Sequence, residues 1–381
     1  MQSEVKTAAN EPVKQPSRRK FLTTATVGAA GAAITGFPMV SVAQSPVVFK
    51  MQGAWGAKDV FNEMAEEYVK RVNEMAEGRM RIDYMVAGSV VKPFEVMDAT
   101  SKGVIDAGHQ VAVYWYGKSK VASLFGSGPV SGCDAAQTLA WIHKEGTVFY
   151  DELVKKMGLD VVGFFAMPMP TQPLGWFKKP LTSAGDLKGF KYRTVGLAAD
   201  LMQELGMRVT QLPGGEIVPA MERGVIDAFE FNNPSSDRRF GAQDVAKNYY
   251  LSSYHQASES FEFIFNRDFM DDLPEDLQAI LRYGVEASAT SNLALAMREY
   301  SKDLAELSAG GVTVHRTPKE ILAAQLEAWD KLIVDLEADP FNKKVMDSQR
   351  AWTEQVAYYE LMNAPDLGLA FEHYYPGKLK L

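Results

Sequence analysis

The chain has 381 residues, of which 46% are hydrophobic and 23% charged, a composition typical of folded globular proteins that excludes disordered and fibrous classes. At roughly 150 residues per domain, this length predicts about two domains with a sizeable core. The net charge is −8 without a basic block, which disfavours a nucleic-acid partner, and the single cysteine, Cys133, excludes a disulfide framework and a Cys-rich metal site.

The first 43 residues have the pattern of a bacterial export signal. Adjacent arginines, Arg18 and Arg19, precede a mildly apolar stretch that ends near Val40, and Ser41-Val42-Ala43 resembles a cleavage site. A transmembrane anchor is the alternative, which glycines, threonines and Pro38 disfavour because they interrupt the apolar run. We therefore expect a twin-arginine signal peptide at 1–43. Its removal takes away five basic and two acidic residues and leaves an acidic protein with a net charge of −11.

The chain that follows begins with the pattern of an α/β domain. Val47–Gln52 is a short apolar run typical of a buried strand, and apolar residues then recur at helical spacing from Val60 to Met75. Residues 80–86 alternate between apolar and polar, which predicts a second strand. Strand, helix and strand in this order open an α/β fold. Neither Gly-x-Gly-x-x-Gly after the first strand nor Gly-Lys-Ser/Thr occurs, so both nucleotide-binding motifs are missing from the sequence.

A segment near residue 100 is repeated near residue 220. Residues 97–107 and 218–228 both end in Gly-Val-Ile-Asp-Ala, which predicts a helix ended by glycine and followed at once by a strand. A separation of 121 residues favours one copy in each of two similar lobes, with chance similarity of two helix–strand junctions as the alternative. Aromatic residues follow each copy, at 114–116 and at Phe229 and Phe231, where they can line a ligand cleft or belong to the core.

The rest of the chain predicts further strands and then long helices. Between the copies we expect a helix, a buried strand, a proline-rich turn and two short strands, at 137–157, 159–166, 167–173, 175–178 and 190–193. Beyond them we expect a strand, a long helix, a last strand and a helical region interrupted at Pro340, at 261–266, 272–309, 312–315 and 318–359. A chain that crosses between two lobes and finishes in long helices fits a protein with a cleft.

The sequence gives no support for covalent catalysis. A Gly-x-Ser-x-Gly elbow is missing, and the five histidines show none of the pairings typical of a metal site. Cys133 lies in a loop-like segment with His143 as the nearest histidine along the chain, so a structural role is favoured over that of a nucleophile. We therefore expect a protein that is not an enzyme.

Three polar residues stand out because they interrupt apolar surroundings. Arg193 ends a predicted strand, where its guanidinium can hold a carboxylate or serve merely as a surface cation. Glu230 lies between two phenylalanines, and a half-buried carboxylate needs a partner. Gln172 lies in the proline-rich turn. Carboxylate, amide and carbonyl oxygens suit Na⁺ or Ca²⁺ rather than a transition metal, with a structural role as the alternative for both residues.

Five short segments carry a resemblance to one family of proteins. They are Gly117-Lys118, Trp176-Phe177, Leu187–Arg193, Leu212–Ala220 and Gly224–Ala228. Together they resemble segments of the substrate-binding proteins of tripartite ATP-independent periplasmic (TRAP) transporters, the DctP-type family. The resemblance spans about 47–359, nearly all of the mature chain. It is nearest to the branch that binds 2-oxo and 2-hydroxy monocarboxylates.

The resemblance implies a role for each of the three polar residues. In that family, the arginine that matches Arg193 clamps the carboxylate of the substrate. In the monocarboxylate branch, residues that match Gln172, Glu230 and Phe231 hold a cation in contact with the substrate, which implies bound Na⁺ or Ca²⁺. Gln256 departs from the pattern, because an acidic ligand is expected there. The loss of that charge favours a monovalent ion, weaker binding or no ion.

The full set of expected site residues follows from the same resemblance. The expected substrate-binding residues are Arg193, Gln172, Tyr114, Trp115, Trp55 and Asn233. The expected cation ligands are Gln172, Glu230, Phe231 through its carbonyl, and Gln256. No catalytic residue is expected, and the resemblance implies a homodimer made by the long C-terminal helices.

The sequence thus predicts an α/β, two-lobe periplasmic-binding-protein fold with a cleft between the lobes, lobe-crossing strands and long C-terminal helices. We expect lobe I at 44–167 with 260–297, lobe II at 168–259 with 298–330, and a dimerising helical segment at 331–381. The expected function is a periplasmic receptor that captures a small organic acid, such as pyruvate or lactate or another acid, and delivers it to TRAP permease subunits. The alternatives are a periplasmic enzyme on a two-lobe scaffold, and a receptor for an ATP-driven transporter or a sensor.

Overall fold

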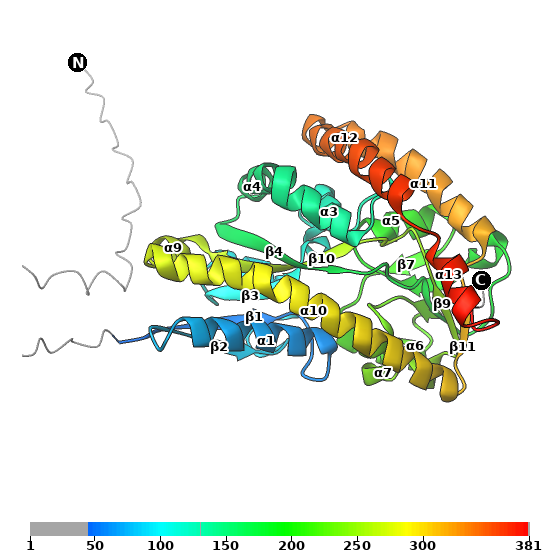
Figure 1. Ribbon diagram of the computed structural model, residues 1–381, viewed down its shortest axis with the longest axis horizontal. Helices are drawn as coiled ribbons and strands as arrows, with labels where there is room; N and C mark the ends of the chain where they lie inside the picture. Colours follow the sequence, from blue (N-terminus) through cyan, green and yellow to red (C-terminus); the bar gives the residue numbers. More distant parts are fainter. Residues whose placement is uncertain (1–44, 130, 380–381) are drawn as a thin grey trace, which may run out of the picture. The chain divides into compact units, whose positions relative to one another are not determined.

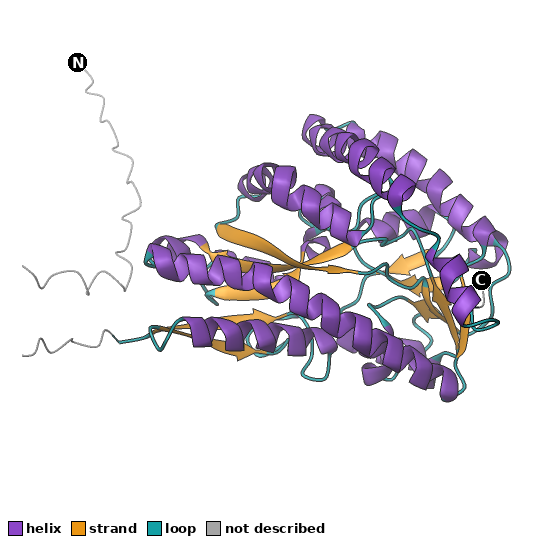
Figure 2. Ribbon diagram, viewed as in Figure 1, coloured by secondary structure: helices purple, strands orange, loops and turns teal. Residues whose placement is uncertain are grey.

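The computed structural model describes residues 45–129 and 131–379, which form an α/β fold built on two β-sheets with helices packed around them (Figure 2). The expected signal peptide and its cleavage site lie outside these residues. Among the helices that are described, none is both long enough and apolar enough to cross a membrane.

The first sheet contains the first strands of the chain and has the order β2-β1-β3-β10-β4. Its strands are β1 (Val47–Gly53), β2 (Met80–Met85), β3 (Ala107–Val111), β4 (Val161–Met169) and β10 (Glu259–Asn266). Here β1 lies parallel between β2 and β3, and β10 runs antiparallel between β3 and β4. We call the part of the chain built on this sheet lobe I.

The second sheet has the order β11-β9-β5-β8-β6-β7. Its strands are β5 (Gly175–Phe177), β6 (Lys191–Arg193), β7 (Arg208–Thr210), β8 (Ala228–Phe229), β9 (Asn248–Leu251) and β11 (Thr313–Arg316). The strand β6 lies parallel between β7 and β8, whereas β5 runs antiparallel between β8 and β9. We call this part lobe II. The residue boundaries of the two lobes remain a prediction.

The first helix shows how local sequence sets these elements. Asp59 caps α1 (Val60–Met75) by accepting a hydrogen bond from the backbone N–H of Phe61 at 2.9 Å. Of the apolar positions expected from the spacing, Phe61, Met64, Tyr68 and Val72 are buried against the first sheet, whereas Met75 at the end of the helix is 40% exposed.

The two copies of the repeated segment fold alike, one in each sheet. In lobe I, α2 (Val96–Ser101) ends before Gly103 and leads into β3; in lobe II, α6 (Ile217–Glu222) ends before Gly224 and leads into β8. Both glycines are left-handed, with φ of 66° and 68°, a conformation that other residues rarely adopt. The interpretation of the repeat as one unit in each lobe is confirmed.

The middle of the chain departs from expectation in two places. The helix expected at 137–157 consists of α3 (Ala135–Trp141) and α4 (Thr147–Lys156), joined by a π-helical turn, Ile142–Gly146. The prediction of a turn at 167–173 is wrong for its first three residues, because these residues belong to β4, which continues to Met169. Pro168 is tolerated there because β4 is an edge strand of the sheet.

Long helices complete the fold. The helix α10 (Glu275–Ala309) contacts β4 and α1 of lobe I and α7 of lobe II, and so runs along both lobes (Figure 1). The helices α11 (Lys319–Glu337) and α12 (Pro340–Asn363) pack against each other, with α11 on α5 and α12 on α3. A last helix, α13 (Leu367–Tyr374), lies within the helical segment expected at 331–381. The remaining helices are α5 (Leu197–Glu204), α7 (Pro234–Phe240), α8 (Ala242–Val245) and α9 (Arg267–Asp271).

The chain crosses between the two sheets three times. It passes from β4 to β5 through residues 170–174, from β9 to β10 through residues 252–258, and from β10 to β11 along α10. The expected lobe-crossing arrangement is therefore present, and two of the crossings carry residues that the sequence singled out.

Candidate functional site

A buried ion pair lies at the ends of two neighbouring strands of lobe II. Arg193 ends β6 and Glu230 follows β8, and the parallel pairing of these strands brings the two residues together. Each side chain is 1% exposed, and Nη1 of Arg193 lies 2.9 Å from Oε1 of Glu230. The reading of Arg193 as a surface cation is therefore wrong.

Further hydrogen bonds fix the guanidinium and leave one side of it open. Nη1 of Arg193 also donates to the carbonyl of Glu230 at 2.8 Å, and Nε donates to the carbonyl of Leu212 at 2.8 Å. The ring of Phe231 lies 5.6 Å from the guanidinium carbon. Nη2 makes no hydrogen bond with any described residue, so its two N–H groups can bind a carboxylate.

Burial dominates the electrostatics of Glu230. Removal from water raises the pKa of its carboxyl from 4.5 to about 7, against the opposing effect of Arg193. One oxygen, Oε2, is buried without a hydrogen-bond partner among the described residues. A positive charge next to this oxygen would favour the ionised form.

Gln172 and Gln256 lie side by side on two of the crossings between the lobes. The backbone N–H of Gln172 donates to the carbonyl of Gln256 at 3.0 Å, and the hydroxyl of Thr171 donates to the carbonyl of Ala257 at 3.0 Å. Both glutamine side chains are buried. The second crossing is also held by α11, because Nε1 of Trp329 donates to the carbonyl of Tyr254 at 2.9 Å.

The side-chain oxygens at these positions fit a hard cation. Oε1 of Gln172, Oε1 of Gln256 and Oε2 of Glu230 are all buried, and none has a hydrogen-bond partner in residues 45–129 and 131–379. Buried oxygens without partners are rare in folded proteins and need an explanation. Amide and carboxylate oxygens are ligands for Na⁺ and Ca²⁺. The fourth expected ligand, the carbonyl of Phe231, remains a prediction.

Sequence reasoning missed a buried acid beside this set. Glu259, at the start of β10, is 1% exposed, and its Oε2 accepts a hydrogen bond from Nε2 of Gln256 at 3.4 Å. Burial raises the pKa of this carboxyl to about 8. The strand was expected to begin only at Phe261, which left Glu259 in a loop.

Aromatic residues of lobe I face the ion pair. Tyr114 lies in the turn after β3, and its ring centroid is 6.2 Å from that of Trp55 and 4.8 Å from that of Phe94. Burial raises the pKa of the Tyr114 phenol, and the charges of Arg193 and Glu230 also act on it, so these groups are close. Contact of Tyr114 and Trp55 with a substrate stays a prediction.

Two other expected substrate-binding residues have structural partners. Trp115 is buried in the core of lobe I, with its ring centroid 5.7 Å from that of Tyr150. Asn233 caps α7, because its Oδ1 accepts hydrogen bonds from the backbone N–H groups of Ser235 and Ser236 at 3.0 and 2.9 Å. Its Nδ2 also donates one hydrogen bond to the hydroxyl of Ser236 at 3.2 Å, so a single N–H of this amide is left to contact a substrate.

The two lobes also touch outside the ion pair. The hydroxyl of Ser236 in lobe II donates to Oδ1 of Asp59 in lobe I at 2.8 Å. The hydroxyl of Tyr116 and Nζ of Lys120, both in lobe I, each bind a carboxylate oxygen of Asp200 in lobe II at 2.8 Å. The lobes are therefore held together by polar contacts at two further places.

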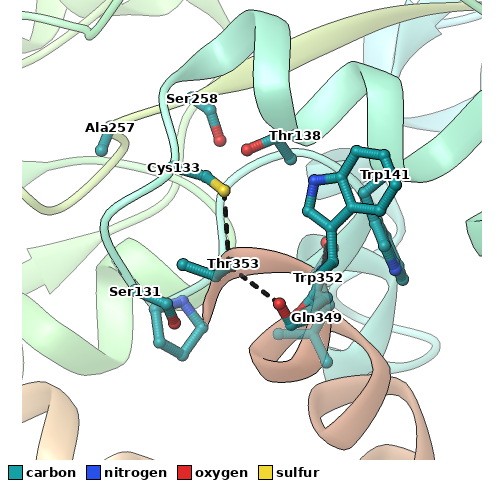
Figure 3. A pocket seen from close by; sticks show the side chains of 12 residues that line it. Ser131, Cys133, Thr138, Trp141, Ala257, Ser258, Gln349, Trp352 and Thr353 are labelled. Atoms are coloured by element: carbon teal, nitrogen blue, oxygen red, sulfur yellow. Dashed lines mark hydrogen bonds between the residues drawn. The ribbon is translucent and has the colours of Figure 1, made fainter. Parts of the chain in front are cut away.

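Cys133 lies in a small pocket between α12 and the loops that precede α3 and β10, which Ala257 and Ser258 also line (Figure 3). Its Sγ donates to the hydroxyl of Thr353 at 3.4 Å, and burial raises the pKa of the thiol, which disfavours the reactive thiolate. Within the described residues, no three His, Cys, Asp or Glu side chains form a group that could hold a metal.

Comparison with known proteins identifies the relatives of this chain. Residues 51–339 match the family described as bacterial extracellular solute-binding protein, family 7. The monocarboxylate 2-oxoacid-binding periplasmic protein of Nostoc sp. is 31% identical over 356 residues, which cover 91% of this chain and 96% of that protein. The resemblance expected from the sequence is confirmed.

Solved structures confirm the two-lobe fold. A TRAP transporter solute-binding protein from Bordetella bronchiseptica, a dimer with calcium and picolinate in an occupied site, has a TM-score of 0.80 and 28% identity, and covers 87% of this chain and 97% of that one. A protein from Colwellia psychrerythraea with calcium and pyruvate has a TM-score of 0.79 and 27% identity over 87% and 100% of the two chains. One from Pseudoalteromonas atlantica with sodium and pyruvate has a TM-score of 0.79 and 26% identity over 87% and 99%.

Proposed function

Because the chain belongs to family 7 of the bacterial extracellular solute-binding proteins, we propose that it captures a small 2-oxo or 2-hydroxy monocarboxylate in the periplasm and passes it to a TRAP permease. The observation that carries the proposal is the buried guanidinium of Arg193, whose Nη2 faces no partner among the described residues. The relative from Nostoc is named for 2-oxoacids, and two similar structures hold pyruvate.

We assign the carboxylate of the solute to Arg193 and a cation to the oxygens of Gln172, Glu230 and Gln256. A bound cation would supply a positive charge to an anionic solute and to Glu230. Arg193 is held rigidly by Glu230 and by the carbonyl of Leu212, so little side-chain entropy is lost when the carboxylate binds. Tyr114 and Trp55 cover the solute from lobe I, which excludes water and strengthens the ionic contacts.

Members of this family are transport proteins, and we propose that this chain too acts by binding alone. The carboxylate of Glu230 is paired with Arg193 and assigned to the cation, and the thiol of Cys133 donates a hydrogen bond to Thr353. A periplasmic enzyme on the same scaffold is the rival. Nuclear magnetic resonance spectra of pyruvate or lactate incubated with the protein distinguish the two, because turnover would produce new signals and binding would not.

We further propose that the end of α12 and α13 form a dimer contact with a second copy of the chain. Large apolar side chains there are mostly solvent-exposed in the single chain, including Tyr358, Tyr359, Leu361, Met362, Leu367, Leu369 and Tyr374. An apolar surface of this kind is typical of an interface, and one similar protein is a dimer. Light scattering should give a dimer mass for the mature chain and a monomer mass after deletion of 364–381; a monomer in both cases would contradict the contact.

The function is tested by calorimetry on the mature protein. Pyruvate and lactate are titrated after removal of metal ions, and again with added CaCl2 or NaCl. We expect micromolar or tighter binding of at least one acid, and tighter binding with an added cation, because each partner improves the site of the other. Failure to bind any small monocarboxylate in all three conditions would contradict the proposal. A permease gene pair without an ATPase gene beside this gene would support delivery to a TRAP permease.

A further inference from the structure

The second crossing between the lobes, residues 252–258, carries Gln256 without forming a helix or strand of its own. It opens at Ser252, a non-glycine residue in the left-handed region with φ of 70°. Such a conformation costs free energy and persists only where neighbouring groups hold it in place. The position of Gln256 therefore depends on what binds this crossing from outside.

The helix α11 binds the backbone of the crossing through two buried side chains one turn apart. Oε1 of Gln325 accepts a hydrogen bond from the N–H of Tyr254 at 2.8 Å, and Nε1 of Trp329 donates to the carbonyl of Tyr254 at 2.9 Å. Gln325 is fully buried and Trp329 is 2% exposed. Residues four apart lie on the same face of a helix. Both polar groups of the Tyr254 backbone thus have partners on one face of α11.

The amide of Gln325 can hold the crossing in only one orientation. The backbone N–H of Tyr254 is a donor, so it must face the amide oxygen, because Nε2 in that place would set two donors against each other. Nε2 of Gln325 then donates to Oγ of Ser253 at 2.9 Å, and the same Oγ lies 2.7 Å from Nδ1 of His255. The contacts thus run from α11 to the residue directly before Gln256.

The helix α11 is itself attached to lobe II. It packs on α5, and Nζ of Lys331 binds the carboxylate of Glu204 at the end of α5. The neighbouring helix α12 packs on α3 of lobe I instead. Gln325 therefore ties the first part of the crossing to the lobe that carries Arg193 and Glu230.

The first crossing, residues 170–174, is tied to the same lobe. It leads into β5, which lies so close to the end of β8 that a Cβ added to Gly175 would be 2.8 Å from Cα of Glu230. The N–H of Gln172 donates to the carbonyl of Gln256 at 3.0 Å. A continuous set of contacts therefore joins the backbones of the two glutamines and Glu230 within lobe II.

Beyond Gln256 the second crossing passes to lobe I. The hydroxyl of Ser258 donates to the carbonyl of Gly126 at 2.8 Å. The side chain of Glu259 packs on the same glycine, where an added Cβ would lie 1.8 Å from Oε1. A change in the angle between the lobes must then be absorbed at 257–258, after Gln256 and not before it.

We infer that Gln325 and Trp329 are positioning residues of the proposed site, which keep Gln256 in the frame of lobe II when the lobes open as well as when they close. The inference rests on the proposed function and goes beyond it by giving α11 a role in binding. Oε1 of Gln256, which has no hydrogen-bond partner in the described part of the chain, is then fixed to the same lobe as the other proposed ligands before the solute arrives. A site held in advance loses less backbone freedom on binding.

The test removes these hydrogen bonds and uses matched controls on α12. Gln325→Met and Trp329→Phe keep an apolar side chain of similar size but lose the bonds to the crossing. Gln349→Met and Trp352→Phe lose bonds of the same kind to backbone carbonyls of lobe I, at 2.7 and 3.1 Å. Calorimetry with pyruvate and CaCl2 should show affinity roughly 5- to 30-fold lower in each of the first two variants, because binding must then fix the backbone of about one residue again. The controls should bind as the wild type does.

Amide hydrogen exchange separates positioning from a general loss of stability. Residues 252–258 of ligand-free Gln325→Met should exchange faster than in the wild type, and pyruvate with CaCl2 should slow them by a larger factor, because binding then orders the crossing. The controls on α12 should leave this segment unchanged.

Two results would overturn the inference and leave the proposed function intact. One is wild-type affinity in both Gln325→Met and Trp329→Phe, and the other is an equal loss of affinity in the two controls. Trp329→Phe decides the matter alone if Gln325→Met does not fold. A wild-type protein that binds no small monocarboxylate would overturn the proposed function, and the inference with it.

Discussion

The two copies of the repeated unit place different residues at equivalent points of the two sheets. In lobe I, β3 pairs with β1 so that Gln52 lies opposite Gly108; in lobe II, β8 pairs with β6 so that Arg193 lies opposite Phe229. The side chain of Gln52 bonds within lobe I: its Nε2 donates to the carbonyl of Val91 at 2.8 Å, and its Oε1 accepts from the backbone N–H groups of Val90 and Val91 at 2.8 and 3.1 Å. Nη2 of Arg193, in contrast, makes no hydrogen bond with any described residue.

The next residue of each unit also differs, with a neutral side chain in lobe I and an ion-paired one in lobe II. His109 in lobe I and Glu230 in lobe II follow at equivalent positions, 121 residues apart. His109 is buried among the rings of Trp55, Phe261 and Phe263, and burial lowers its pKa to about 3, which keeps it neutral. The comparison shows that the backbone unit is repeated while its side chains differ, and that the charged pair of Arg193 and Glu230, to which we assign the solute and a cation, belongs to lobe II.

The largest effect expected from this difference is at Arg193. In the proposed complex, the guanidinium of Arg193 pairs with the carboxylate of pyruvate. Removal of one partner of such a buried pair costs roughly 2–5 kcal/mol of binding free energy, so Arg193→Met should weaken pyruvate binding roughly 30- to several-thousand-fold. Arg193→Lys should fall between this variant and the wild type, because a single ammonium cannot reproduce the planar fork. Calorimetry measures both affinities.

The matched control is Gln52→Met at the equivalent point of lobe I. It removes hydrogen bonds within that lobe and should lower the melting temperature, with pyruvate affinity unchanged. Arg193→Met should also lose stability, since Glu230 is left buried without its cation, so binding is compared at a temperature where circular dichroism shows both variants folded. Equal losses of affinity in the two variants would break the comparison.

A smaller effect is expected at Glu230. Glu230→Gln keeps an oxygen but removes the charge, and should lower Ca²⁺ affinity on the order of 100-fold. The substitution His109→Gln at the equivalent position should leave Ca²⁺ affinity unchanged. Calcium titrations with pyruvate present decide the matter, and unchanged affinity in Glu230→Gln would leave this acid with a structural role alone.

A third prediction concerns pH and the buried acid Glu262 of lobe I. Burial raises its pKa from 4.5 in the unfolded chain to about 8 in the native protein, so the native state retains a proton that the unfolded state has released. Stability therefore falls as pH rises from about 4.5 to 8, by at most about 1.4 kcal/mol per pH unit for this group.

Melting temperatures of the ion-free protein between pH 5 and pH 8 measure this slope. Glu262→Gln should flatten it by a few degrees over the range, because the amide does not titrate. The remaining slope comes from other buried acids, among them Asp237 of lobe II, whose pKa burial raises to about 7. A slope that Glu262→Gln leaves unaltered would show that Glu262 does not titrate in this range.

The smallest expected effect is at the contact between the lobes. Ser236→Ala removes the hydrogen bond to Asp59, which is worth about 1 kcal/mol when the lobes are together and nothing once they separate. Pyruvate affinity should fall up to about fivefold. Small-angle scattering should show a larger radius of gyration for the ligand-free variant than for the wild type. An unchanged affinity and radius would mean that this bond does not contribute to closure.

Features that depend on neighbouring residues could be predicted from the sequence. The repeated unit and the strand end at Arg193 are local patterns of apolar spacing and glycine, and both are present in the structure. The ion pair between Arg193 and Glu230 could not be predicted, because it depends on the pairing of β6 with β8 across 37 residues of sequence. The same holds for Glu259, whose burial depends on a loop 133 residues earlier in the chain.

The contact of Glu259 with Gly126 restricts the order in which such a site can evolve. The backbone of Gly126 has φ of −148° and ψ of −73°, outside the main regions that other residues adopt, and an added Cβ would lie 1.8 Å from Oε1 of Glu259, so both conformation and space favour glycine. A side chain at 126 would force the carboxylate of Glu259 to move, so glutamate at 259 is accommodated most easily where residue 126 is already glycine. Conversely, with Glu259 in place, alanine at 126 would displace this buried carboxylate and should be destabilising.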